Sequence, residues 1–240
     1  MKESSASVTV TVPPDLKGTK GLVQDWSSDQ KAFKGVPWGK AMMWIFLVSV
    51  TFVFSIFLIS YLTGRISTKI EWPNPSQVFA LHVGHVSVPL LLIAIMTFIL
   101  ITSSGTMALA VKYGYEKNRK MCAILMLATA IFGASFVGMQ AFEWTKLIME
   151  GVRPWENPFG APQFGSIFFM VTGFHGTHVT IGVIFLFIMA RKAWRGDFDT
   201  GRRGFFTSQK SNYEAIEIMG LYWHFVDFVW VFIFAFFYLW

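Results

Sequence analysis

Five ionisable residues stand inside long apolar stretches of the sequence, and their spacing points to chemistry. His175 and His178 are three positions apart, as are His224 and Asp227, and Glu143 closes a further apolar stretch. Residues three apart share a helix face. Paired histidines on facing helices ligate haem or a metal ion, and chains of carboxylates and imidazoles relay protons. The plainer alternative is a set of interhelical hydrogen bonds, each stabilising a membrane bundle by about 1 kcal/mol.

The sequence favours the plainer alternative. A proton relay needs ionisable groups from one membrane face to the other, but the last apolar stretch has none after Asp227 and the first has none at all. Haem ligation by His175 and His224 would require an open slot between two helices. We therefore predict a structural "polar seam", defined as Glu143, His175, His178, His224 and Asp227, with no catalytic residue and no metal site in this chain.

Membrane spans must carry these residues. Of the 240 residues, 54% are hydrophobic and 14% are charged, whereas an average soluble domain has about 25% charged residues. A transmembrane helix needs about 20 mainly apolar residues. We predict an all-α, polytopic membrane bundle over residues 38–240, preceded by a polar cytoplasmic tail at 1–37. Its five transmembrane helices are expected at about 41–63, 86–111, 121–142, 164–190 and 218–240.

The distribution of basic residues predicts the orientation of these spans. Sixteen of the twenty lysines and arginines lie in the tail or in the connections after the second and fourth spans. Basic connections remain in the cytoplasm, so the N-terminus should be cytoplasmic and the C-terminus should lie on the opposite side. Since the positive charge flanks the membrane, we expect no nucleic-acid partner. Four interfacial residues are candidates for binding phospholipid headgroups, namely Arg65, Trp144, Arg153 and Arg191.

Four segments resemble those of a known family. Residues 173–182 (GFHGTHVTIG), 222–230 (YWHFVDFVW) and 140–144 (QAFEW) are similar to signature segments of subunit III of haem–copper terminal oxidases, and Ser103-Ser104-Gly105 fits as well. The resemblance covers about residues 38–240 in the same order. It is to the short, five-helix bacterial form of the subunit.

The resemblance implies a non-redox accessory subunit of a proton-pumping oxidase that reduces O2 to water. Such a subunit flanks the catalytic subunit I, within a complex that also holds subunit II and small subunits. It has no cofactor of its own, because haem and copper belong to partner subunits. It binds phospholipid and supports proton uptake and sustained turnover, here in a bacterial plasma membrane as a multi-pass protein. The alternatives are an accessory subunit of a nitric oxide reductase and, in a different class, an autonomous haem-binding membrane protein or transporter.

The sequence departs from the family pattern in two ways. Many relatives have seven spans arranged as a V around bound lipid, and the first two have no counterpart here. Either a partner subunit supplies that arm or the lipid cleft is open on one side. In the first span, relatives often carry a buried glutamate in a pattern like Trp-x-Phe-x-x-Ser-Glu. The matching stretch runs from Trp44 to Val50, and Val50 stands where the carboxylate would be.

Overall fold

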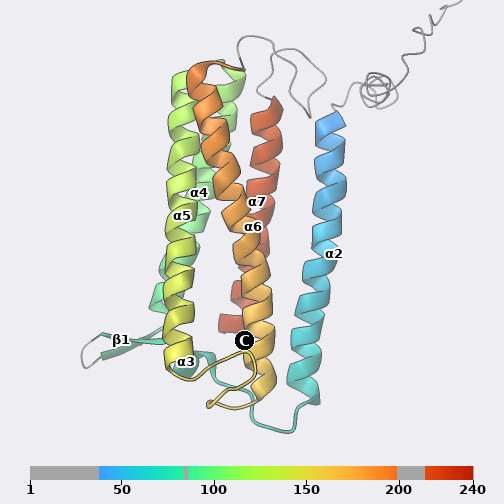
Figure 1. Ribbon diagram of the computed structural model, residues 1–240, viewed down its shortest axis with the longest axis vertical. Coiled ribbons are helices and arrows are strands. Elements are labelled where there is room, and N and C mark those ends of the chain that lie inside the picture. Colours follow the sequence, from blue (N-terminus) through green and yellow to red (C-terminus); the bar gives the residue numbers. More distant parts are fainter. Residues whose placement is uncertain (1–37, 84–85, 199–213, 240) are drawn as a thin grey trace, which may run out of the picture. The chain divides into compact units, whose positions relative to one another are not determined.

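The computed structural model describes residues 38–83, 86–198 and 214–239, and all of them belong to one compact unit, Trp38–Trp240 (Figure 1). The predicted tail at 1–37 lies outside the described residues. The elements are α2 (Trp38–Ser67), α3 (Pro75–Val78), β1 (Ala80–Val83), β2 (Val86–Pro89), α4 (Leu91–Tyr115), α5 (Arg119–Met149), α6 (Pro162–Arg195), α7 (Glu214–Phe234) and the π-helix η1 (Ala235–Leu239).

Five of these segments are long and apolar enough to cross a membrane, which confirms the predicted all-α bundle with five spans. They contain 25 to 34 residues. The longest, α6, extends over about 51 Å at 1.5 Å per residue. This exceeds the roughly 30 Å of a hydrocarbon core, so its ends reach into the polar headgroup layers.

The predicted start of the second span at residue 86 was wrong. Residues 86–89 form β2, which pairs antiparallel with β1 so that Val83 lies opposite Val86 and Ala80 opposite Pro89. Helix α4 begins at Leu91, after Leu90 adopts a left-handed backbone with φ 60°. Proline lacks the amide hydrogen that a helix interior uses, and valine favours extended backbone. Apolar composition alone does not register either effect.

The predicted end of the third span at residue 142 was also too early. Helix α5 continues through Glu143 to Met149. The prediction stopped at the first ionisable residue, but Glu143 is buried inside the bundle. Beyond it, Lys146 and Glu150 form an i,i+4 ion pair of 3.5 Å across the last turn, an arrangement that supports a helix.

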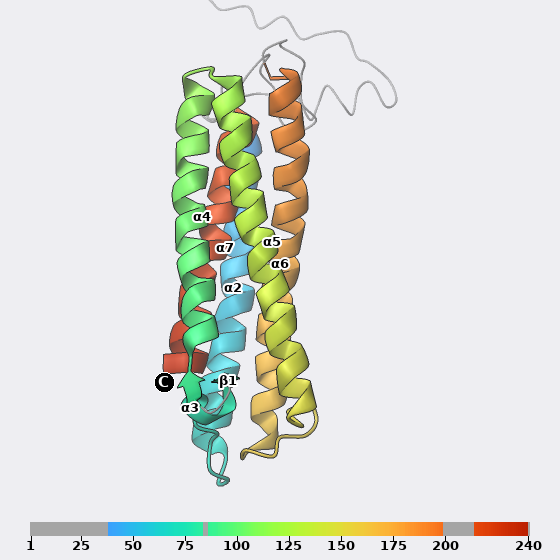
Figure 2. The ribbon, with the colours of Figure 1, turned by 90° about the vertical axis from the view of Figure 1, so that its left-hand side faces the viewer.

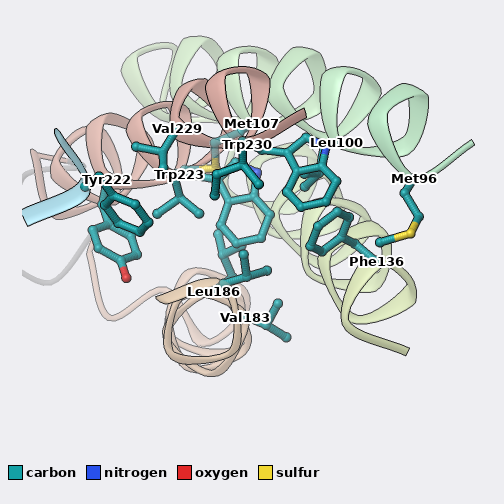
Figure 3. Packing of buried hydrophobic residues seen from close by; sticks show 14 of the residues in the cluster. Met96, Leu100, Met107, Phe136, Val183, Leu186, Tyr222, Trp223, Val229 and Trp230 are labelled. Carbon is teal, nitrogen blue, oxygen red and sulfur yellow. The ribbon is translucent and has the colours of Figure 1, made fainter. Parts of the chain in front are cut away.

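Helix α7 is the central element of the bundle. It contacts α2, α4 and α6, while α5 packs between α4 and α6. Its large aromatic side chains Trp223 and Trp230 are buried, and Figure 3 shows the cluster that they form with neighbouring helices, in which Trp230 packs against Phe136 of α5. We call the end of the bundle where α2 and α7 begin and α6 finishes the "basic end", and the end with β1 and η1 the "hairpin end" (Figures 1 and 2).

Candidate functional site

Trp223 of α7 fills a slot formed by three other helices. Its indole Nε1 donates a hydrogen bond of 3.0 Å to the hydroxyl of Ser103 in α4. The ring lies over Gly133 of α5 and Gly182 of α6, where a Cβ atom would stand 2.4 Å and 3.0 Å from ring carbons. Only residues without a side chain leave room for the ring at these two points. Glycines allow such close approach in membrane bundles, and here they seat an indole.

The next residue of α7, His224, contacts Ser104, the serine that follows Ser103 in α4. Its Nδ1 lies 2.6 Å from the hydroxyl of Ser104, and the Asp227 carboxylate, one turn further along α7, also lies near Ser104. Two consecutive residues of α7 therefore meet two consecutive residues of α4. We call this set the "serine clasp", defined as Ser103, Ser104, Trp223, His224 and Asp227. It joins two of the segments that carried the family resemblance.

His175 lies in an aromatic enclosure. Its imidazole is 1% exposed and stacks on Trp230, with ring centroids 5.3 Å apart and planes inclined by 29°. The edges of Phe54 and Phe136 close two more sides. In the part of the chain that the structure describes, neither ring nitrogen has a hydrogen-bond partner. Its neighbour His178 contacts the carbonyl of Phe174 through Nδ1 at 2.9 Å.

The two histidine-containing pairs, one in α6 and one in α7, contact different neighbours in the structure. The sequence allowed His175 and His178 to meet His224 and Asp227 across α6 and α7. Instead, the first pair faces aromatic side chains, Phe54 among them, and the second pair faces Ser104. Among the described residues, α6 and α7 are joined here by the Tyr222 hydroxyl, which donates to the carbonyl of His178 at 2.9 Å.

Glu143 forms a separate cluster at the hairpin end. Its carboxylate is 3% exposed, and Oε2 accepts hydrogen bonds from Gln140 Nε2 at 2.8 Å and from the Tyr238 hydroxyl at 3.2 Å. The other oxygen, Oε1, has no partner among the described residues. Glu143 therefore ties α5 to η1. The Gln140-to-Glu143 motif is consistent with a structural function of this kind.

Sequence reasoning missed an ionic contact at the basic end. Lys40 of α2 lies 2.6 Å from the carboxylate of Glu217 in α7, and the Tyr115 hydroxyl of α4 donates to the same carboxylate. The signal was available, because Lys40 and Glu217 had been placed at the boundaries of two spans at the same depth. Nearby, the two carboxylate oxygens of Glu214 are buried and have no hydrogen-bond partner within the described ranges.

The four candidate headgroup residues do not form one site. Arg65 lies in the last turn of α2, and Trp144 and Arg153 also lie toward the hairpin end, whereas Arg191 lies at the basic end in α6. Trp144 packs on Phe169 rather than standing free. Arg191 lines a surface groove between α5 and α6. Within the described ranges, no group of three or more His, Cys, Asp or Glu side chains is placed to hold a metal ion.

Comparison with known proteins gives one consistent family. The sequence model of the family described as cytochrome c oxidase subunit III matches residues 27–240. A probable quinol oxidase subunit 3 of Staphylococcus epidermidis is 32% identical over 196 residues, which cover 82% of this chain and 86% of that protein. Its counterpart in Staphylococcus saprophyticus is 30% identical over 208 residues, covering 86% and 90%. A probable cytochrome c oxidase subunit 3 of Rickettsia prowazekii is 32% identical over 212 residues, covering 83% and 68%.

Proposed function

We propose a structural and lipid-organising role for this chain, from the premise that it belongs to the cytochrome c oxidase subunit III family. It is an accessory subunit of a haem–copper terminal oxidase and a multi-pass membrane protein that associates with other oxidase subunits. Our proposal is that it binds the catalytic subunit I directly, beside subunit II and small subunits. In the bacterial plasma membrane, with the basic end in the cytoplasm, it supports proton uptake and sustained turnover.

The serine clasp is the observation that carries this proposal. His224 and Asp227 are the ionisable residues of α7 nearest the middle of its span. The Ser104 hydroxyl contacts His224 and lies near Asp227. Trp223 is engaged by Ser103 in the same way. Polar groups that satisfy one another between helices fix a bundle. They are then not open to a haem or to a moving proton, which favours a supporting function over a redox one.

Replacing Ser104 with alanine in the assembled oxidase tests this function. The matched control is Ser135→Ala in α5, because the Ser135 hydroxyl is exposed and, among the described residues, bonds only the Ile131 carbonyl of its own helix at 2.9 Å. We expect the Ser104 variant to lose the subunit, or its activity, sooner during prolonged turnover, with initial turnover close to the control. His224→Leu and Asp227→Leu should behave in the same way. Zero initial turnover in a fully assembled complex would make these residues catalytic and overturn the proposal.

Isolation of the chain separates the accessory function from the alternatives. After mild-detergent purification, a haem–copper subunit should co-purify in equal amount, and the haem spectrum should disappear when that subunit is removed. Haem retained by this chain alone would instead support ligation by His175, His178 or His224. Co-purification with a nitric oxide reductase catalytic subunit would move the chain to that enzyme class.

The outward face of α2 is apolar and suits contact with lipid or with a helix of a partner subunit. Among the helices, α2 packs mainly against α6 and α7, and it exposes Trp44, Ile45, Phe52, Ile56 and Ile59. These apolar side chains need lipid or a partner helix around them. A structure of the whole oxidase that shows neither partner helices nor lipid along this face would contradict this part of the proposal.

A further inference from the structure

A groove runs along the outer surface of α5 and α6 at the basic end. It has a volume of about 550 Å³, and Figure 2 shows the two helices that form it side by side at this end. Its walls are apolar, with Ala123 and Leu127 from α5 and Phe187 from α6. Two of the lining residues, Ala123 and Ala190, carry only methyl groups, which leaves space between the larger side chains.

Two arginines stand at the basic end of the groove. Arg191 and Arg195 line it and are four residues apart, so they lie on one face of α6, in line with Phe187. Both side chains are exposed, and among the described residues neither forms an ion pair. A guanidinium group offers a planar pair of donors that matches a phosphate. The groove therefore combines an apolar trough within the membrane with two phosphate-binding groups at its polar end.

This combination selects one class of occupant. A soluble anion would satisfy the arginines but leave the apolar trough unfilled, and an apolar helix would fill the trough but leave the arginines without an anion. A phospholipid does both. The basic end faces the cytoplasm according to the distribution of basic residues, and the leaflet on that side is the anionic one.

We propose that the α5–α6 groove binds one anionic glycerophospholipid of this leaflet. Its phosphate lies between Arg191 and Arg195, and one acyl chain lies along Ala123, Leu127 and Phe187. The inference rests on the proposed lipid-binding function and gives it a location formed by α5 and α6. That location is distinct from any cleft that α2 borders.

The test compares lipid binding by the delipidated oxidase complex in native mass spectrometry. Dioleoyl-phosphatidylglycerol is the anionic probe and dioleoyl-phosphatidylcholine the zwitterionic one. The variant Arg191→Gln/Arg195→Gln should lose affinity for phosphatidylglycerol by at least about tenfold, because it loses the charge-assisted hydrogen bonds of two guanidinium groups to the phosphate. The matched control is Lys120→Gln/Lys192→Gln, which removes the same charge from the same ends of α5 and α6 outside the groove. It should lose much less.

A second variant examines the apolar trough. Leu127→Trp places a large ring in the groove and should reduce the retention of both lipids while both arginines remain. The proposal is wrong if the arginine variant and its lysine control lose phosphatidylglycerol binding equally. It is also wrong if a structure of the complex shows a helix of another subunit in the groove.

The site and the general function fail in different ways. If phospholipid still co-purifies with the arginine variant at the wild-type level, the location is wrong but the lipid-binding function stands. If delipidation and re-addition of either lipid change nothing in the wild-type complex, the lipid-binding function itself fails.

Discussion

Replacing Gly133 with alanine probes the slot that holds Trp223. An added Cβ would lie 2.4 Å from Cη2 of Trp223 and 2.7 Å from Cγ2 of Val183, both far inside van der Waals contact. The ring cannot easily move aside. Its Nε1 is held by Ser103 at 3.0 Å, and its other edge already lies against the backbone of Gly182.

The expected loss follows from overpacking. Forcing one extra carbon into a well-packed interior costs typically 1–3 kcal/mol, partly offset by the roughly 0.5–1 kcal/mol that alanine gains over glycine in a helix interior. The control variant Gly138→Ala makes the same gain of alanine over glycine, so this gain cancels when the two variants are compared. Gly138 lies in the same helix, and its Cβ position has nothing within 4 Å. The difference between the two variants is therefore the packing cost, about 5-fold to about 150-fold in the unfolding equilibrium constant.

The assay is dissociation and unfolding of the subunit in the detergent-solubilised oxidase, titrated with sodium dodecyl sulfate and followed by Trp fluorescence and by the amount of subunit retained. Gly133→Ala should shift the transition to lower denaturant, whereas Gly138→Ala should match or exceed wild type. Shortening the ring with Trp223→Phe should relieve the clash, so Gly133→Ala should cost less in that background, as a double-mutant cycle measures. Equal stability of the two alanine variants, or no coupling with Trp223→Phe, would refute the reasoning.

Two further predictions concern Glu143 and the first span. Tyr238→Phe removes a donor to the buried Glu143 carboxylate and should destabilise the subunit by about 1–3 kcal/mol in the same titration. The control Tyr113→Phe loses no hydroxyl bond within the described residues and should leave the stability unchanged. Equal effects of the two variants would show that the Glu143 contact contributes little. A hydrophobic carbodiimide reacts with buried carboxyl groups, so it should leave the wild-type span around Val50 unlabelled and should label the Val50→Glu variant. Stoichiometric labelling of that span in the wild type would overturn the alignment of Val50 with the family glutamate.

The number and approximate place of the spans were predictable because ionisable residues are costly in hydrocarbon. The same rule explains the errors. It ended the third span before Glu143, although a carboxylate with donors from Gln140 and Tyr238 is tolerated inside a bundle. It also began the second span too early, because the segment before Leu91 is apolar but pairs as a β-hairpin.

The contacts of the polar seam were less predictable than its membership. A period of 3.6 residues per turn fixes the angle between His224 and Trp223 on one helix, but it does not fix how that helix is rotated against its neighbours. On depth alone the sequence allowed His175 to meet His224, but it left that rotation open. Ser104 and His224 both stand about two turns inside the basic ends of their predicted spans, and they are the pair that makes contact.

The five helices differ in how much of their surface is buried inside the bundle, which affects how the subunit responds to lipid and to partner subunits. Half of the most apolar window of α7 is buried, against 17% for α2. Exposed apolar area is no penalty in a bilayer, because lipid tails are as apolar as leucine. The contacts that retain α2 include the Lys40–Glu217 ion pair at the basic end, Phe54 against the ring of Phe174 near mid-depth, and Tyr61 against the ring of Phe237 toward the hairpin end. Among the long helices α2 packs mainly on α6 and α7, whereas α7 packs on α2, α4 and α6. An adjustment of α2 to a lipid or a partner helix therefore changes fewer interfaces than a movement of α7, which would also disrupt the serine clasp.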